Sequence, residues 1–368
     1  MHGNQSSARG TVLAAGGPRP RGRQAGQIGR RLMTMVALGL AGLAALPTAA
    51  ATTEAMVAAD AASARDRRQA PLYLPVWPGE GLAPGDRPLA QPQQTIERSS
   101  DPSLRDRYVD RISQPTLVMY RPARPNGTAL LVIPGGGYQR VVLDKEGTAL
   151  LPEFVERGGL TLFVLRYRLP GEGHADGADA PFADAQRALR TIRANAAQWG
   201  VDPHRIGVMG FSAGGHVAAS LGTRYGERVH APIDDIDAAD ARPDFQLLIY
   251  PVIDMSGSAA HAGSRKQLLG PRPSRKQSRR YSPQYHVDAR TPPTFLLHAQ
   301  DDAVVPVANS LLFYDALRVA GVPSEMHLFP QGGHGFGVRG TTGLTVAAWP
   351  RLALDWIAAQ AVPKEDTP

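Results

Sequence analysis

Cysteine is absent from this sequence of 368 residues. The absence excludes disulfide bonds, a thiolate metal site and a cysteine nucleophile. Stability must therefore come from a hydrophobic core. A chain of this length with 43% hydrophobic residues can form a sizeable one.

Acidic residues are missing from the first 51 positions, which contain six arginines. Several of these arginines precede an apolar run at 32–46, and small residues at 47–51 provide a cleavage site after Ala51. The pattern predicts a secretion signal over residues 1–51 and a flexible lead-in over 52–70, with export to the periplasm or the medium. The apolar run is too short to be a stable membrane anchor. Arg30-Arg31 lacks the usual following residues of a twin-arginine signal, so we favour ordinary secretion.

Basic character is largely confined to this predicted signal. The formal net charge of the chain is +7, and it falls to +1 without the six arginines of residues 1–51. Nucleic-acid binding therefore loses its main support. The sequence gives no basis for an oligomeric state.

Apolar strands alternate with helical stretches through residues 71–368, which we interpret as one catalytic domain. Strands are expected near 117–120, 129–133, 160–167, 206–210, 245–250, 294–297 and 325–329, and helices near 147–157, 184–198, 213–225, 309–319 and 345–360. Asp184 is the expected cap of the second helix. Such alternation predicts an α/β fold with a mostly parallel central sheet and helices on both faces.

A nucleophile elbow is the most informative local pattern. The sequence Gly210-Phe211-Ser212-Ala213-Gly214 follows an apolar strand and opens a helix rich in small residues, which is the setting that a G-x-S-x-G serine requires. The sharp turn strains the serine backbone and exposes its hydroxyl. The helix that starts at Ala213 directs free amides toward a developing oxyanion.

A second glycine-rich segment, Pro134-Gly135-Gly136-Gly137-Tyr138, follows the strand at 129–133. Consecutive glycines allow a backbone to approach a substrate closely, as in oxyanion loops of the HGGG type. The amides of Gly136, Gly137 and Ala213 are the predicted oxyanion donors. Tyr138 is expected either to line the substrate pocket or to pack in the core.

The acid and the base are expected after the last two strands. Asp302 follows the strand at 294–297, and His334 lies in a glycine-rich loop after the strand at 325–329. Their order after Ser212 is that of α/β-hydrolase triads. Asp301 and Asp254 are alternative acids. His298, His327 and His216 fall inside predicted strands or a helix, where a histidine satisfied by packing is expected.

These motifs together resemble the α/β-hydrolase esterases of the acetylxylan esterase and lipase-like (BD-FAE-type) group. The resemblance extends from about residue 71 to the end of the chain and also includes Leu72–Gly79, Lys145–Gly147, Tyr167–Pro170, Asp184–Ala188 and Tyr250–Val252. It implies the α/β-hydrolase fold with a small cap segment. It also implies a serine esterase that removes short acyl groups, acetyl in particular, from small esters or acetylated plant polysaccharide, without a cofactor or metal.

A basic segment departs from this resemblance. Residues 264–280 contain seven cations and no acid: Arg265, Lys266, Arg272, Arg275, Lys276, Arg279 and Arg280. They could form a rim that attracts acidic polymers, or an ordinary solvated loop. An exopeptidase of the prolyl-oligopeptidase kind and a non-catalytic binding protein remain alternative functions. The exopeptidase alternative is disfavoured because the segment between the predicted signal and the first predicted strand is too short for the amino-terminal propeller that such enzymes usually carry.

Overall fold

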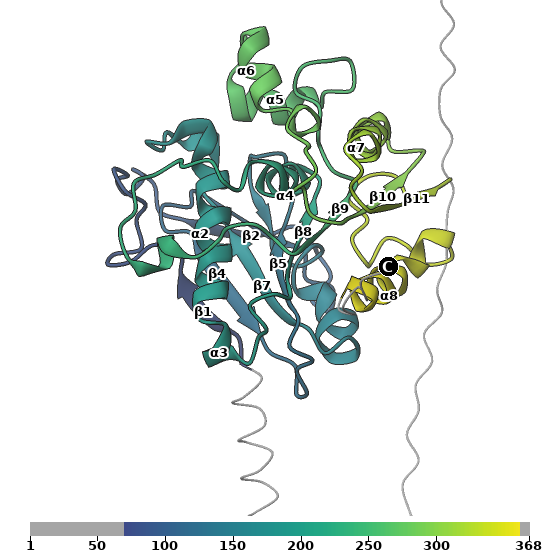
Figure 1. Ribbon diagram of the computed structural model, residues 1–368, viewed down its shortest axis with the longest axis horizontal. Helices are drawn as coiled ribbons and strands as arrows, with labels where there is room; N and C mark the ends of the chain where they lie inside the picture. The colour runs from purple at the N-terminus through teal and green to yellow at the C-terminus, as the bar shows by residue number, and fades with distance from the viewer. Residues whose placement is uncertain (1–69, 361–368) are drawn as a thin grey trace, which may run out of the picture. The chain divides into compact units, whose positions relative to one another are not determined.

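The structure is a computed structural model that describes residues 70–360. The predicted secretion signal and nearly all of the predicted lead-in lie outside the described residues. At the centre is an eight-stranded sheet in the order β1-β4-β7-β5-β8-β9-β10-β11 (Figure 1). The strands are β1 (Leu72–Pro75), β4 (Thr116–Tyr120), β5 (Ala129–Ile133), β7 (Thr161–Arg166), β8 (Ile206–Phe211), β9 (Phe245–Ile249), β10 (Thr294–Ala299) and β11 (Ser324–Phe329).

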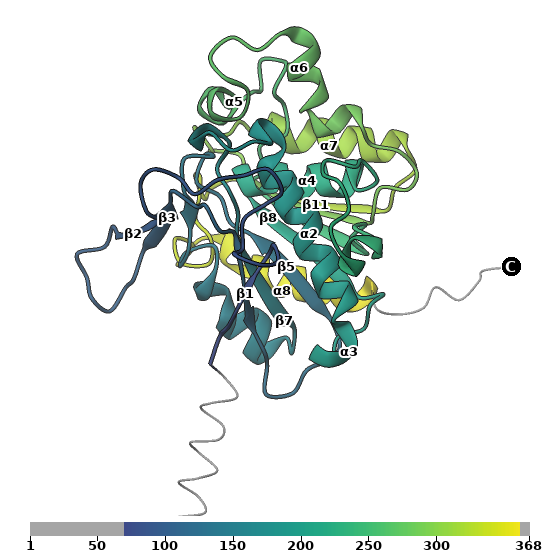
Figure 2. The same ribbon diagram turned by 90° about the vertical axis from the view of Figure 1, so that its left-hand side faces the viewer.

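The sheet is parallel from β7 to β11, and β1 and β4 join it antiparallel at one edge. This confirms the predicted fold class. All seven predicted strands are present, and the inner strands β5, β8, β9 and β10 are runs of mostly apolar residues that are buried along their whole length. The sequence patterns missed β1 and a small antiparallel sheet of β2 (Gln94–Glu97), β3 (Arg107–Asp110) and β6 (Val141–Val142), which lies to one side in Figure 2.

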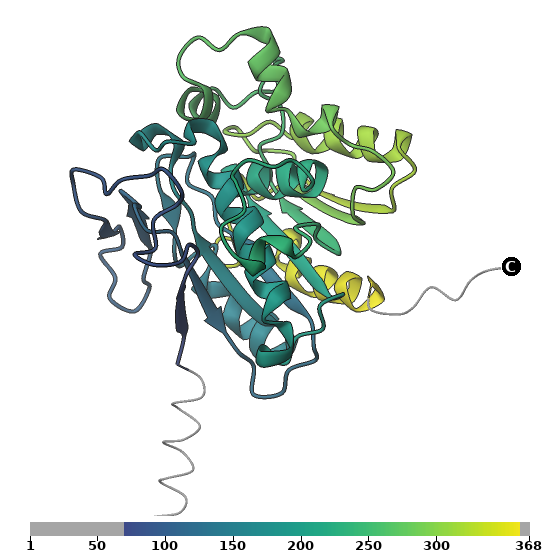
Figure 3. The same cartoon turned by 60° about the vertical axis from the view of Figure 1, so that its left-hand side comes forward.

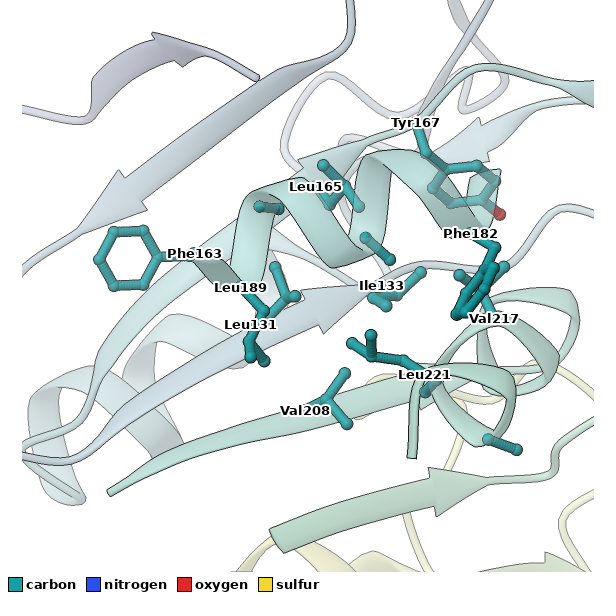
Figure 4. Close-up of a cluster of buried hydrophobic side chains, with 14 of the residues drawn as sticks. Leu131, Ile133, Phe163, Leu165, Tyr167, Phe182, Leu189, Val208, Val217 and Leu221 are labelled. Atoms are coloured by element: carbon teal, nitrogen blue, oxygen red, sulfur yellow. The ribbon is translucent and has the colours of Figure 1, made fainter. Parts of the chain in front are cut away.

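Helices cover both faces of the main sheet. On one face lie α2 (Ala180–Ala194), α4 (Ala213–Arg224) and α7 (Ala308–Val319), and on the other lie η2 (Leu151–Arg157), a π-helix, and α8 (Trp349–Gln360). Alternation along β5 supplies both cores, because Leu131 and Ile133 face one layer while Leu130 and Val132 face the other. Figure 4 shows the first layer beneath α2 and α4.

Shorter elements complete the domain. They are η1 (Thr148–Leu150), η3 (Pro170–Glu172), η4 (Gly177–Asp179), α3 (Ala196–Trp199), η5 (Asp235–Ala238), η6 (Pro283–Tyr285) and η7 (Thr345–Ala348). Between β9 and β10 the chain forms α5 (Ala262–Leu269) and α6 (Arg275–Arg280), which project at one end of the domain (Figure 3). These two helices contain six of the seven cations of the basic segment.

The predicted cap role of Asp184 is wrong. Helix α2 begins earlier, at Ala180, so Asp184 falls inside it and is fully buried. Its carboxylate accepts hydrogen bonds from the Trp77 indole at 2.7 Å and from the Arg168 guanidinium at 2.9 Å. A buried charge is tolerated only when it is paired in this way. Asp184 therefore joins α2 to the segment after β7 instead of starting a helix.

Candidate active site

Ser212 occupies a strained turn between β8 and α4, with φ 51° and ψ −117°. Its amide donates to the Ile249 carbonyl at 3.1 Å, and its own carbonyl accepts from the Val252 amide at 3.0 Å, so the end of β9 and the segment after it hold the turn. A strained residue costs about 1–3 kcal/mol and persists where surrounding contacts fix it. Gly214 is required because a Cβ there would overlap the Ile133 carbonyl.

A continuous hydrogen-bond chain links Ser212, His334 and Asp302. The Ser212 hydroxyl lies 2.8 Å from His334 Nε2, and His334 Nδ1 lies 2.6 Å from Asp302 Oδ2. Since a carboxylate only accepts, Nδ1 carries the proton and Nε2 of the neutral ring accepts from the hydroxyl. The arrangement can transfer a proton away from Ser212 while the imidazolium that forms stays paired with Asp302.

Asp302 is held as a carboxylate. Burial works against its charge, but hydrogen bonds from His298, His334 and the Val305 amide outweigh burial and lower the pKa of Asp302. The Val304 and Val305 amides donate to Oδ1 at 2.9 and 2.8 Å. His298 Nε2 approaches Oδ2 at 3.3 Å and also donates to the Val305 carbonyl. His298 is thus a core histidine, as expected, and it also contacts the acid.

The alternative acids have other partners. Asp301 Oδ1 accepts from the Gly333 amide at 2.8 Å, so it holds the loop that carries His334 without contacting the imidazole. Asp254 closes a turn after β9 by accepting from the amides of Ser256 and Gly257, both at 2.8 Å. The geometry therefore brings Asp302, and neither alternative, to His334.

The predicted oxyanion loop follows β5 directly. Gly136 has φ +136° and Gly137 has φ +66°, conformations that side chains disfavour. A Cβ on Gly136 would also overlap the Arg140 carbonyl. Among residues 70–360, no backbone group accepts a hydrogen bond from the Gly136 or Gly137 amide. Both glycines line the cavity onto which Ser212 opens, so their amides are available to a ligand.

Tyr138 does not line this cavity. Its side chain is only 1% exposed, and its hydroxyl donates to His216 Nδ1 at 2.6 Å. His216 Nε2 in turn donates to the Tyr281 carbonyl at 2.6 Å, and burial lowers the pKa of His216 to about 4. The left-handed backbone at Tyr138, φ 61°, turns the ring into the interior. Of the two predicted roles, the structure shows core packing.

Glu146 is a buried acid that sequence reasoning did not assign to the site. Its Oε2 accepts from the Gly135 amide at 2.7 Å, and its Oε1 accepts from the Tyr250 hydroxyl at 3.0 Å. The same hydroxyl accepts from the Gly337 amide at 3.0 Å. Glu146 and Tyr250 therefore connect the oxyanion loop to the loop of His334. The signal in the sequence is Lys145-Glu146-Gly147, which is part of the family resemblance and does not by itself predict a role for Glu146.

The cavity above Ser212 has a volume of about 330 Å³. Besides Ser212 and His334, its walls include Gly136, Gly137, Arg140, Lys145, His261 and Val304. His261 caps the start of α5, and its Nδ1 accepts from the Ser264 amide at 3.2 Å. A neutral His261 therefore carries its proton on Nε2. Burial lowers the pKa of His261, which favours this neutral form.

The basic segment is mostly exposed. Within α6, Arg280 pairs with Glu227 at 3.2 Å, and the Arg279 guanidinium lies 3.9 Å from the centre of the Tyr285 ring. Whether this surface attracts acidic polymers stays a prediction. Within residues 70–360, no helix combines the length and apolar character needed to cross a membrane.

Comparisons with known proteins agree with this geometry. The chain is 33% identical over 257 residues to an acetylxylan esterase from Xylanibacter ruminicola, covering 68% of this chain and 49% of that protein. It is 38% identical over 209 residues to endo-1,4-beta-xylanase B from Butyrivibrio fibrisolvens, covering 57% of this chain and 32% of that protein. The chain thus spans half or less of the length of these two relatives.

A solved structure aligns more completely. The acetyl ester-xyloside bifunctional hydrolase from Caldicellulosiruptor lactoaceticus superimposes with a TM-score of 0.64 at 35% identity, covering 78% of this chain and 96% of that one. A sequence profile of the BD-FAE family matches residues 117–317, which include the elbow serine and the oxyanion loop. The chain therefore belongs to the BD-FAE family of α/β-hydrolases and is similar to acetylxylan esterases.

Proposed function

We propose that this protein removes short acyl groups, chiefly acetyl, from a plant polysaccharide such as xylan by serine catalysis. The observation that carries the proposal is the chain Asp302–His334–Ser212, which ends on a strained serine at an open cavity. The names of the relatives support ester hydrolysis and an acetylated xylan substrate. The volume of about 330 Å³ falls in the range of small-molecule sites.

In the proposed mechanism, Ser212 Oγ attacks the carbonyl carbon of the ester as its proton moves to His334 Nε2. Negative charge collects on the carbonyl oxygen, where the amides of Gly136, Gly137 and Ala213 stabilise it. The C–O bond to the alcohol then breaks, and the leaving oxygen takes the proton from His334. A water molecule, deprotonated by His334, attacks the acyl-enzyme and releases the acid and Ser212. Asp302 stays ionised and stabilises the imidazolium in both halves.

A substrate series tests this proposal. Chromogenic esters of increasing acyl length are assayed beside acetylated xylan and an aminoacyl anilide. We expect the highest kcat/KM with acetyl and release of acetate from the polymer. Cleavage of the anilide but of no ester would instead indicate an exopeptidase.

Variants test the assigned residues. Ser212→Ala and His334→Ala should each lower ester turnover by about three orders of magnitude or more, because triad members act as a unit. Circular dichroism and thermal unfolding would show that both variants are folded. Near-parental turnover by either folded variant would refute the proposed mechanism.

We also propose that the protein acts outside the cytoplasm, since residues 1–51 have the composition of a secretion signal and the proposed substrate is a polymer. Expression of the full chain, followed by cell fractionation and amino-terminal sequencing, tests this. We expect a protein that begins near residue 52 in the periplasm or the medium. An uncleaved chain found only in the cytoplasm would contradict the prediction.

A further inference from the structure

Two cations in the wall of the Ser212 cavity have no acidic partner among residues 70–360. Arg140 and Lys145 both line the cavity, both are partly buried, and neither forms an ion pair in the described part of the chain. Arg98 lies in the same wall, but its charge is balanced by Asp106 at 2.6 Å. Glu146 also lines the cavity but forms an ion pair with neither cation, so Arg140, Lys145 and Glu146 together still leave this wall with a net positive charge.

The acids closest in sequence are already occupied. Asp144 is bound by Arg107 at 2.8 Å and accepts from the Thr148 hydroxyl. Glu146 has one carboxylate oxygen on the Gly135 amide and the other on the Tyr250 hydroxyl. Neither acid comes within 4.0 Å of Lys145 to form an ion pair. The positive charge is thus available to a molecule that enters the cavity.

Both cations lie beside groups of the proposed reaction. The Lys145 ammonium is 3.9 Å from the position that a Cβ would take on Gly335, the residue after His334. The Arg140 carbonyl touches Gly136, so Arg140 belongs to the same tight turn as the proposed oxyanion donors. The Arg140 guanidinium lies 5.1 Å from the centre of the Tyr108 ring, where the ring supports it from one side. A carboxylate held by these cations would belong to the same substrate as the ester.

We propose that Arg140 and Lys145 form a carboxylate-binding subsite, so that the preferred substrate carries an acidic sugar next to the acylated one. The inference rests on the proposed esterase function and specifies its substrate class. An acetyl group has no charge, so the carboxylate belongs to the alcohol part of the ester. Arginine and lysine bind carboxylates through charge-assisted hydrogen bonds, which are stronger than neutral ones, and partial burial reduces screening by solvent.

The test compares two substrates that differ only in this carboxylate. One is an acetylated xylo-oligosaccharide bearing glucuronic acid, and the other is the same compound with its carboxyl group reduced to an alcohol. At low salt and neutral pH, we expect the parent enzyme to favour the acidic substrate by about tenfold or more in kcat/KM. Added salt should reduce the preference, since a cavity open to solvent is screened at high ionic strength.

Variants assign the preference to the two residues. Arg140→Gln and Lys145→Gln should each lower the ratio of the two kcat/KM values by about three- to tenfold, and the double variant should bring it close to one. Arg318→Gln is the matched control, because it removes one positive charge from α7 at an exposed residue that does not line the cavity. It should leave the ratio unchanged. Thermal unfolding of each variant shows whether it is folded.

The outcomes separate this inference from the proposed function. If the parent hydrolyses both sugar substrates equally well and does not prefer a succinyl monoester to the butanoyl ester, the esterase stands and the carboxylate subsite is refuted. If a succinyl monoester is preferred over the butanoyl ester while the two sugar substrates are equivalent, the carboxylate lies on the acyl side and our assignment to the sugar is wrong. If no ester is cleaved, the proposed function itself fails.

Discussion

Glu146 should control catalysis without touching the substrate carbonyl. Its carboxylate holds the Gly135 amide at 2.7 Å and the Tyr250 hydroxyl at 3.0 Å, while Tyr250 holds the Gly337 amide at 3.0 Å. Gly135 precedes Gly136 and Gly137, two of the three predicted oxyanion donors, and Gly337 lies three residues after His334. Replacing Glu146 with alanine therefore removes the hydrogen bonds that connect the oxyanion loop to the loop of His334.

The expected magnitudes follow from these contacts. Glu146→Ala leaves two buried donors without an acceptor, and each such group costs about 1–3 kcal/mol, so the free energy of unfolding should fall by about 2–4 kcal/mol once water enters the vacated space. The oxyanion amides are displaced rather than removed. A displacement of about 1 Å in a site of this kind lowers rates by about 10²-fold, so we expect kcat to fall about 10- to 100-fold with a smaller change in KM.

The assay must separate positioning from stability. Glu172 provides the control, because it also accepts from two backbone amides, those of Arg111 at 2.6 Å and Ile112 at 3.1 Å, but does not line the cavity. We expect Glu172→Ala to lower the melting temperature and leave kcat per folded molecule near that of the parent. Glu146→Gln, which keeps one acceptor oxygen, should recover part of the lost kcat.

Labelling of Ser212 by a phosphonate gives a second readout for Glu146, since the adduct needs both the nucleophile and the oxyanion amides. The rate of labelling should fall in parallel with kcat in Glu146→Ala. A folded Glu146→Ala variant with kcat within about twofold of the parent would refute the reasoning.

Three further predictions follow from the site. Asp302→Asn should lower kcat by about 10³-fold or more, whereas Asp301→Asn and Asp254→Asn should lower it far less. If steady-state kinetics show a larger loss for Asp301→Asn or Asp254→Asn, that residue is the triad acid instead. Gly136→Ala should abolish most activity in a protein that still folds, because its Cβ would overlap the Arg140 carbonyl; near-normal acetyl ester turnover would contradict this. Burial opposes the charge of Asp144, but hydrogen bonds from Arg107 outweigh burial and lower the pKa of Asp144 to about 2. The ionised carboxylate therefore stabilises the folded state at pH values above its pKa in the unfolded chain, and this stabilisation is lost as the pH falls through 2. Denaturant titrations of parent and Asp144→Asn should differ by about 2 kcal/mol at pH 6, and the two should converge only below about pH 2.

Local patterns were sufficient for seven of the eight strands of the main sheet, all but β1, and for the positions of the predicted triad. Strands β5 and β8 are short apolar runs with buried side chains throughout, and glycine-rich sequence marks the end of each, in a loop after β5 and at the turn into α4 after β8. In a parallel sheet these segments meet at the carboxyl ends of the strands. The sequence was therefore enough to place the predicted triad of Ser212, Asp302 and His334. Each of these residues comes shortly after a strand, and the residues adjacent in sequence mark where that strand ends.

Side chains whose position depends on distant partners could not be placed in this way. An aspartate near the start of a helical pattern resembles a cap, yet Asp184 is buried because Trp77, 107 residues earlier, and Arg168 supply its hydrogen bonds. Tyr138 follows the predicted oxyanion loop, yet its hydroxyl donates a hydrogen bond in the interior to His216, 78 residues later. Neither partner belongs to the pattern that suggested the role.

The adjacent residues Asp301 and Asp302 illustrate the same limit at the centre of the site. They are consecutive in the sequence, and both contact the loop at 330–337. The amides of Val304 and Val305 bind Asp302 from its own turn, and this leaves Oδ2 directed at the His334 imidazole. Asp301 instead binds the Gly333 amide and fixes the same loop one residue earlier. One acid thus orients the base while its neighbour anchors the backbone that carries it, so removing Asp301 should shift His334 without depriving the ring of its carboxylate.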